Sequence, residues 1–179
     1  KTVDFNVIGK CNLDCVWCWG PDHKTKETLS ASDWIEAGRQ LWQLGTRNIV
    51  ITGGEPLLRK DIVEILKGLK EIGMRVTLST NTIALLSEKN SKVLEFLDEI
   101  GIPLDGSTEE ANNVMRKGTK RSFRSALDAI KHVQENYPNI KMTVRTVVSR
   151  RNINDVENIP LTLEARGIDL TKFRWKLYQ

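Results

Sequence analysis

Short apolar and β-branched runs alternate along the chain with longer segments of helical periodicity. The runs predict six strands, at residues 2–9, 48–52, 74–80, 102–105, 142–148 and 173–178. The helical segments predict five helices, near residues 33–44, 60–72, 88–100, 122–136 and 156–166. Ser32 and Ser122 stand where helix caps are expected, and Gly45 and Gly73 stand where helices should end. Strands that alternate with helices through right-handed crossovers indicate an α/β chain with a parallel sheet.

Polar side chains recur at alternate positions of the expected strands. A parallel sheet covered on both faces has nearly continuous apolar strands, and a closed (β/α)8 barrel fills its interior with branched apolar side chains. Here the period of two places polar residues on one face of the sheet; they are Asp4, Asn6, Thr77, Ser79, Asn81, Thr143, Arg145, Arg174 and Lys176. We therefore predict an open, partial parallel β/α barrel of about six strands, whose concave face is wet or holds a ligand. The alternative is that some of these groups only mark strand ends.

Composition and charge narrow the class of protein. The 179 residues are 40% hydrophobic and 28% charged, as in an ordinary globular protein, so we expect one domain over residues 1–179. The net charge of +4 comes from scattered residues, which argues against a nucleic-acid partner but allows small anionic ligands. No apolar stretch reaches the ~18 residues of a membrane span, and the start lacks the apolar core of a secretory signal, so we expect a cytoplasmic protein without membrane contact. The start at Lys1 and the stop within an apolar pattern at Gln179 are compatible with a piece of a longer protein.

All three cysteines lie in the stretch "CNLDCVWC", at Cys11, Cys15 and Cys18, directly after the first expected strand. Chemistry in α/β proteins lies at this carboxyl edge of the sheet. An odd number of closely spaced cysteines favours a metal site in a reducing compartment over a disulfide framework. Structural zinc needs four ligands and usually two knuckles, and this chain offers one knuckle with His23 as a candidate fourth ligand. Three cysteines on an iron–sulfur cube would leave one iron open for catalysis.

A second motif, "ITGGEPLL", follows the second expected strand and supplies a Gly-Gly-Glu-Pro turn. The Cys-x3-Cys-x2-Cys loop and this turn together resemble the radical S-adenosylmethionine (radical SAM) superfamily, and the resemblance spans nearly the whole chain. Trp17 also fills a position where that family often has an aromatic residue. The resemblance implies an oxidoreductase or lyase with a [4Fe–4S] cluster on the three cysteines and S-adenosylmethionine on the fourth iron. It further implies a 5′-deoxyadenosyl radical that abstracts hydrogen from a second substrate, and a reductant such as flavodoxin or ferredoxin.

The same resemblance suggests roles for particular residues. It implies that Glu55 and the backbone of Gly53 and Gly54 hold the methionyl amine, while Ser79 and Asn81 contact the ribose. The remaining candidates for the cofactor site are Pro56, Trp17, Arg145 for the methionyl carboxylate, and Asp105 without an assigned role.

The second substrate is a separate question. Arg174 and Lys176 share one face of the last expected strand, Arg145 lies on its neighbour, and Lys120 with Arg121 follows the fourth strand. Several cations around one cavity favour an anionic or phosphorylated substrate. The segments "RWKLYQ", "VVSRRN" and "DGSTEEANNVMRKGTKR" are similar to those of the viperin family, which dehydrates a nucleoside triphosphate.

Two features depart from the viperin pattern. The stretch "TNT" replaces the Ser-Asn-Gly common at the third strand, and "LDGS" is typical of many peptide-modifying members of the superfamily. A radical SAM enzyme that modifies a peptide or carbohydrate therefore stays open as an alternative. A non-enzymatic zinc or iron–sulfur binding module is the alternative from another class.

Overall fold

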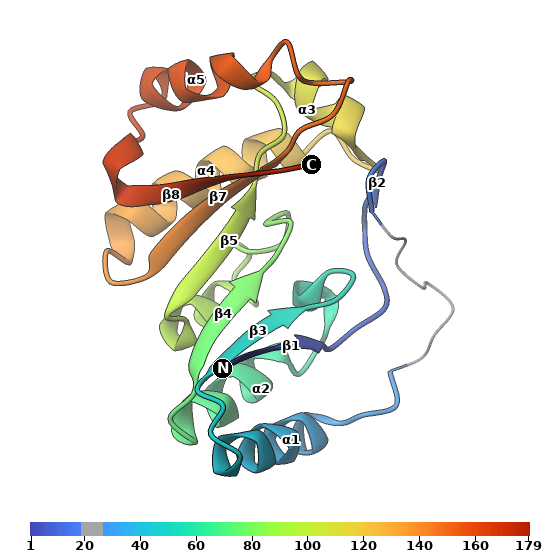
Figure 1. Ribbon diagram of the computed structural model, residues 1–179, viewed down its shortest axis with the longest axis vertical. Helices are drawn as coiled ribbons and strands as arrows, with labels where there is room; N and C mark the ends of the chain where they lie inside the picture. Colours follow the sequence, from blue (N-terminus) through green and yellow to red (C-terminus); the bar gives the residue numbers. More distant parts are fainter. Residues whose placement is uncertain (19–26) are drawn as a thin grey trace. The chain divides into compact units, whose positions relative to one another are not determined.

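The structure is a computed structural model that describes residues 1–18 and 27–179 (Figure 1). Within these residues, a six-stranded parallel sheet has the order β1-β3-β4-β5-β7-β8, and β2 and β6 form a separate two-stranded ladder. The large sheet is open, since β1 and β8 are its end strands. The predicted class, an α/β partial barrel, is therefore confirmed. His23, the candidate fourth zinc ligand, lies outside the described residues.

The described part of the chain divides into two compact units. The first comprises residues 1–11, 27–80 and 84–100, and the second comprises residues 12–18, 81–83 and 101–179. None of the helices in residues 1–18 and 27–179 combines the length and the apolar composition needed to cross a bilayer.

Three strands and two α-helices form most of the first unit. They are β1 (Thr2–Asn6), α1 (Ala31–Gln43), β3 (Asn48–Thr52), α2 (Ile62–Glu71) and β4 (Arg75–Ser79), with the 3-10 turns η1 (Pro56–Leu58) and η2 (Ser91–Phe96). The strands are parallel neighbours in the order β1, β3, β4. Ile49 and Ile51 of β3 and Val76 and Leu78 of β4 are fully buried at alternate positions. This alternation produces one apolar face and leaves the intervening, mostly polar positions at least partly exposed.

The helix ends of the first unit follow capping rules, with one correction. Ser30, not Ser32, caps α1: its hydroxyl accepts from the Asp33 N–H, and the Asp33 carboxylate accepts from the Ser30 N–H. The prediction for Ser32 was wrong because the helix begins at Ala31, so Ser32 already lies inside the first turn. Gly45 and Gly73 follow the ends of α1 and α2 with positive φ, as predicted.

The predicted helix at residues 88–100 was wrong. Its apolar spacing matched a helical period, but the chain forms only the short turn η2 and then the strand β5 (Glu99–Pro103). Asp98 supplies the physical reason. Its backbone N–H donates to the Val76 carbonyl, its carboxylate accepts from the Val76 N–H at 2.7 Å, and Lys70 pairs with that carboxylate at 2.7 Å. These bonds draw the chain alongside β4 and end the turn.

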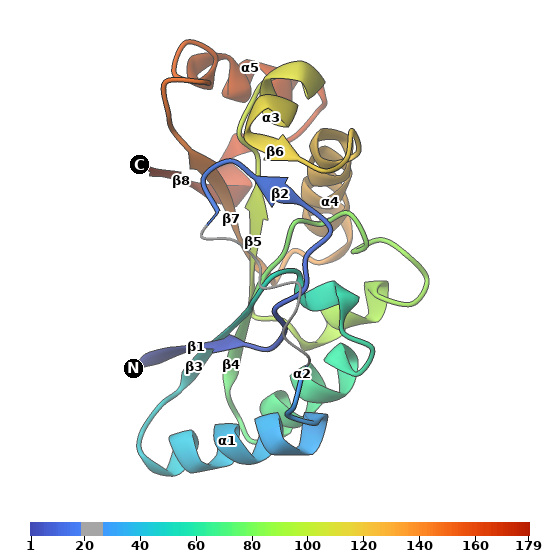
Figure 2. The ribbon, with the colours of Figure 1, turned by 90° about the vertical axis from the view of Figure 1, so that its right-hand side faces the viewer.

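The second unit contains the remaining elements. They are β2 (Asp14–Cys15), α3 (Glu109–Met115), β6 (Arg116–Lys117), α4 (Ser122–Asn136), β7 (Lys141–Val147), η3 (Val156–Asn158), α5 (Ile159–Ala165), η4 (Leu170–Lys172) and β8 (Phe173–Tyr178). Figure 2 shows β2 beside β6, next to α3. Ser122 begins α4 instead of capping it, and its hydroxyl accepts from Asn112 Nδ2 at 2.9 Å. α3, β2 and β6 were not predicted, because each is short and polar in sequence.

Candidate functional site

The Gly-Gly-Glu-Pro turn is bonded to the segment that leads into Cys11. In the first unit, the Gly54 N–H donates to the Ile8 carbonyl at 2.7 Å, and the Glu55 N–H donates to the Lys10 carbonyl at 2.9 Å. A Cβ at Gly54 would overlap the Lys10 carbonyl group. The second glycine of the motif is thus required by the neighbouring backbone of the chain itself. The turn fixes the residue directly before the first cysteine.

Glu55 is buried and has internal partners. Its side chain is 1% exposed, and its Oε1 accepts from the Leu57 N–H at 3.0 Å and from the Thr80 hydroxyl at 2.7 Å. This carboxylate caps the 3-10 turn that begins at Pro56. Gly53 has a φ of 144°, in the region that favours glycine. The motif therefore combines a tight turn with a buried anion.

Ser79 and Asn81, the candidate ribose contacts, belong to different units. Ser79 ends β4 in the first unit and is half-buried. In the second unit, Asn81 Nδ2 donates to Asn12 Oδ1 at 2.6 Å, and Asn81 Oδ1 accepts from the Ile83 N–H at 3.1 Å. Asn81 thus holds the residue after Cys11. Thr82 has a left-handed φ of 67°, which glycine adopts without strain, so the "TNT" departure has a backbone cost.

The second half of the cysteine loop is tied to β6. β2 pairs antiparallel with β6 so that Cys15 lies opposite Arg116, and the Val16 N–H donates to the Met115 carbonyl at 3.0 Å. The Cys18 N–H donates to the Cys15 carbonyl at 3.1 Å, which closes a tight turn between these two cysteines. This turn and the ladder give the loop a defined shape from Asn12 onward.

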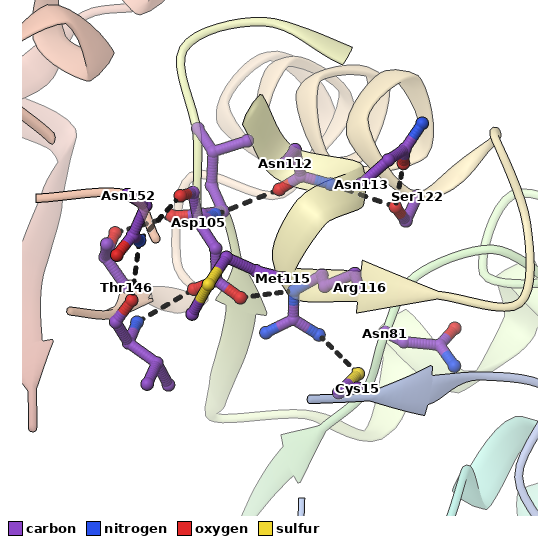
Figure 3. A network of polar contacts seen from close by, with 12 residues as sticks. Cys15, Asn81, Asp105, Asn112, Asn113, Met115, Arg116, Ser122, Thr146 and Asn152 are labelled. Atoms are coloured by element: carbon purple, nitrogen blue, oxygen red, sulfur yellow. Dashed lines mark hydrogen bonds and ion pairs between the residues drawn. The ribbon is translucent and has the colours of Figure 1, made fainter. Parts of the chain in front are cut away.

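Arg116 is a candidate site residue that the sequence did not single out. It is 5% exposed, and its Nε lies 2.8 Å from Asp105 Oδ2. Its Nη1 lies 3.8 Å from the Cys15 sulfur, and its Cζ lies 5.1 Å from the centre of the Trp17 ring. Figure 3 shows the guanidinium between Asp105 and Cys15. A buried cation therefore contacts two residues of the cysteine loop.

Asp105 is the anion that balances this cation. It is fully buried, and its Oδ1 accepts from the Val147 N–H at 2.8 Å. Burial raises the pKa of the Asp105 carboxyl above its ordinary value, while the charge of Arg116 and hydrogen bonds from Val147 and Trp17 oppose that rise. The Oδ2 of the same carboxylate forms a buried ion pair with Arg116 Nε at 2.8 Å.

Arg145 and the cations of β8 lie on one face of the β7–β8 pair. Arg145 is opposite Lys176 in the parallel register, and Thr143 is opposite Arg174. Residues that are paired in register point to the same side of a sheet. The Arg145 guanidinium also lies across Gly101 of β5, where any Cβ would overlap it. The structure therefore brings Arg145, Arg174 and Lys176 together on adjacent strands, as expected from their positions.

The other side of β8 is only partly covered. Trp175 Nε1 donates to the Thr146 hydroxyl at 2.9 Å, which fixes the indole against β7. Leu177 is 56% exposed, since it lies near the end of an edge strand. Lys120 and Arg121 are exposed in the segment between β6 and α4.

The donor set fits an iron–sulfur cluster in its chemistry. Cys11 and Cys15 are half-buried thiols and Cys18 is an exposed one. Arg116 places a positive charge 3.8 Å from the Cys15 sulfur, which suits the negative charge of a metal-bound sulfur ligand. Among residues 1–18 and 27–179, no three His, Cys, Asp or Glu side chains are gathered as a preformed metal site. Cys11 falls in the first unit and the other two cysteines fall in the second.

Comparison with known proteins identifies the family. The model of the radical SAM superfamily matches residues 5–162, and the chain belongs to this superfamily of enzymes, which use a [4Fe–4S] cluster and S-adenosylmethionine. A probable GTP 3′,8-cyclase of Methanopyrus kandleri is 38% identical over 64 residues, which are 35% of this chain and 21% of that protein. A probable GTP 3′,8-cyclase of Archaeoglobus fulgidus is 46% identical over 61 residues, which are 31% of this chain and 19% of that protein.

Solved structures support the fold. Streptococcus suis SuiB bound to the precursor peptide SuiA superimposes with a TM-score of 0.80 at 19% identity, over 99% of this chain and 39% of that one. The same protein bound to S-adenosylmethionine gives a TM-score of 0.74. The chain thus spans about two fifths of the length of SuiB. The segment that matches the curated relatives covers about a fifth of their length.

Proposed function

We propose that the chain is the core of a radical SAM enzyme and holds one [4Fe–4S] cluster through Cys11, Cys15 and Cys18. When bound, the cluster and S-adenosylmethionine supply one-electron reductive cleavage and a 5′-deoxyadenosyl radical for hydrogen abstraction. The observation that carries the proposal is the anchoring of the cysteine loop. Lys10 is fixed by the Gly-Gly-Glu-Pro turn, and Cys15 is fixed by the ladder with β6. Three thiolate ligands leave one iron of a cube open for a substrate.

The residues proposed for S-adenosylmethionine have distinct tasks. Glu55 offers a buried carboxylate for the methionyl ammonium, beside the backbone of Gly53 and Gly54. Arg145 offers a guanidinium for the methionyl carboxylate, in the fork geometry that suits carboxylates. The further candidates are Pro56, Ser79 and Asn81. Trp17 and Asp105 are assigned instead to the support of the cysteine loop through Arg116. The guanidinium lies over the Trp17 ring, and Asp105 forms an ion pair with it.

The second substrate is proposed to be anionic and phosphate-bearing. Lys176 of β8 lies opposite Arg145 of β7 in the register, so two cations share one face of this strand pair, and several cations around one site suit an anionic ligand. Arg174 adds a third cation on the same face. Relatives named GTP 3′,8-cyclase act, by that name, on a nucleoside triphosphate, which agrees with such a substrate. SuiB was solved with a precursor peptide, and a peptide substrate is the competing proposal.

The chemistry of the cysteines indicates the cellular compartment in which the protein works. Three thiol ligands need a reducing compartment, so we place the protein in the cytoplasm with flavodoxin or ferredoxin as reductant.

Reconstitution of the full chain under anaerobic conditions tests the proposal. The expected result is four irons per chain, an oxygen-sensitive brown protein, and release of 5′-deoxyadenosine when a reductant and S-adenosylmethionine are added. Replacement of the three cysteines by alanine should abolish all three properties. A stoichiometry well below four irons, or zinc that iron does not displace, would contradict the proposed function and favour a binding module.

A further inference from the structure

The guanidinium of Arg116 is held in place from the side opposite the cysteine loop. Asp105, its ion-pair partner, receives the Asn152 side chain on its backbone carbonyl at 2.9 Å, and its N–H donates to Asn112 Oδ1 at 3.0 Å. Asn112 in turn donates to Ser122 at the start of α4. Figure 3 shows this chain of contacts. Neither member of the ion pair can move without breaking several bonds to β7, α3 or α4.

Arg116 also has an N–H group that faces the cysteine loop. Its Nε is engaged with Asp105 Oδ2 at 2.8 Å, whereas its Nη1 donates to the Cys15 sulfur at 3.8 Å. A sulfur accepts hydrogen bonds at such longer distances, and Cys15 is one of the proposed iron ligands. The site therefore offers a fixed cationic N–H donor to a ligand sulfur of the cluster.

Such a donor has a known physical consequence. Reduction adds an electron to an iron–sulfur cluster, so a positive charge or a hydrogen bond at a ligand sulfur stabilises the reduced form and raises the reduction potential. A fixed negative charge nearby has the opposite effect. Arg116 supplies the positive charge and Asp105 the negative one, and the guanidinium lies between the carboxylate and the Cys15 sulfur (Figure 3).

We propose that Arg116 is a positioning residue that sets the reduction potential of the cluster through its contact with Cys15, and that Asp105 holds it there and moderates its charge. This inference rests on the proposed [4Fe–4S] site. It assigns the ion pair to electron acceptance from the reductant, not to S-adenosylmethionine binding.

The test compares the reduction potential of the cluster between wild type and variants of the full chain after reconstitution. A redox titration monitored by electron spin resonance measures this potential. Asp105→Asn keeps the shape and the acceptor for the Val147 N–H but removes the negative charge, so the potential should rise. Arg116→Met/Asp105→Asn removes both charges without leaving a buried charge unpaired, so the sulfur loses its donor and the potential should fall. A tenfold change in the equilibrium constant of reduction, about 59 mV for one electron, is expected in each case.

Controls separate this inference from the proposed function. Arg166→Met removes an exposed cation of the same unit and should leave the potential unchanged. Wild-type protein without four irons would overturn the proposed function. Wild-type protein with four irons, but with the same potential in all variants that also hold four, would overturn the role of Arg116 alone. If Arg116→Met/Asp105→Asn does not fold, Arg116→Gln/Asp105→Asn takes its place: a potential below that of Asp105→Asn supports the role of Arg116, and a potential equal to that of Asp105→Asn or above it overturns that role.

Discussion

At the scale of single residues, Glu55 combines an observed structural task with a proposed binding task on one carboxylate. One oxygen caps the turn at Pro56 by accepting from Leu57, and it also accepts from the Thr80 hydroxyl. Because the side chain is 1% exposed, an ammonium group that reached it would be shielded from water, which strengthens an ion pair. The structural task needs only an oxygen acceptor, whereas the binding task needs the negative charge. A substitution that keeps the acceptor separates them.

Glu55→Gln is that substitution. It should leave the iron content and the unfolding temperature close to wild type but weaken S-adenosylmethionine binding by about 1.5 to 3 kcal/mol, roughly ten- to a hundredfold in the dissociation constant. Calorimetric titration of the reconstituted protein measures this change, with the exposed Glu64→Gln as the matched control. An unchanged dissociation constant would show that the backbone of the motif, not this carboxylate, holds the amine.

The residue scale also shows which parts of the site a sequence reveals. The cysteine loop and the Gly-Gly-Glu-Pro turn are local patterns, so spacing alone could predict them. Arg116 has no local signal: its contact with Cys15 joins residues 101 positions apart and depends on the register of β2 with β6. Asp105 was singled out from sequence without a role, because its partner could not be known before the fold.

At the scale of elements, the strands of the six-stranded sheet were predicted better than the short helices and the two-residue strands. Alternation of apolar residues at positions such as Ile49 and Ile51 predicts a strand because burial of one face requires it. α3 was missed, since a seven-residue polar helix has no apolar stripe and depends on its Thr108 cap, which accepts from the Ala111 N–H at 3.2 Å. The site needs this helix, because it places Met115 and Arg116 against the cysteine loop.

The two helices of the first unit meet at glycines. A Cβ on Gly68 of α2 would lie 2.6 Å from Cγ1 of Ile35 in α1, and a Cβ on Gly38 would overlap Leu69. Both glycines lie inside helices, where glycine costs about 1 kcal/mol relative to alanine. The close approach of α1 and α2 is the packing reason for them.

Gly68→Ala should therefore destabilise the chain although it improves helix propensity. Overpacking costs about 1 to 3 kcal/mol and the propensity gain returns about 1 kcal/mol, so we expect a net loss of roughly 1 kcal/mol in thermal or urea unfolding. Ile35→Ala removes Cγ1, Cγ2 and Cδ1, so Gly68→Ala should cost less stability in the Ile35→Ala background than in the wild type. Equal or higher stability of Gly68→Ala alone would show that the two helices can separate without cost.

At the scale of the whole molecule, the fold is established more firmly than the reaction. Nearly the whole chain superimposes on SuiB, but at 19% identity this likeness shows only a shared fold. The similarity to GTP 3′,8-cyclases covers about a third of the chain, so the relatives do not define the second substrate. The determinants of that substrate must be sought in residues specific to this chain. The cationic face of β7 and β8 is the feature to test.

Neither Arg174 nor Lys176 forms an ion pair with any residue of the described chain, and Lys176 lies opposite Arg145 in the register. We predict that a nucleoside triphosphate or sugar phosphate stimulates the release of 5′-deoxyadenosine by the reconstituted full chain. Arg174→Ala/Lys176→Ala should reduce this stimulation at least about tenfold, because each lost charge-assisted contact to phosphate costs about 1.5 kcal/mol or more.

The matched control for this screen is Arg124→Ala/Arg166→Ala, which also removes two cations of the second unit but none on the β7–β8 face. It should respond to phosphate compounds as the wild type does, so that a loss confined to the β8 variant reports a local contact and not the change in net charge. Short peptides belong in the same screen, because SuiB was solved with one. Stimulation by a neutral peptide alone, equally strong in wild type and in both double variants, would reject the phosphate-bearing substrate and support a peptide-modifying enzyme, since the β8 cations would then make no contribution to substrate binding.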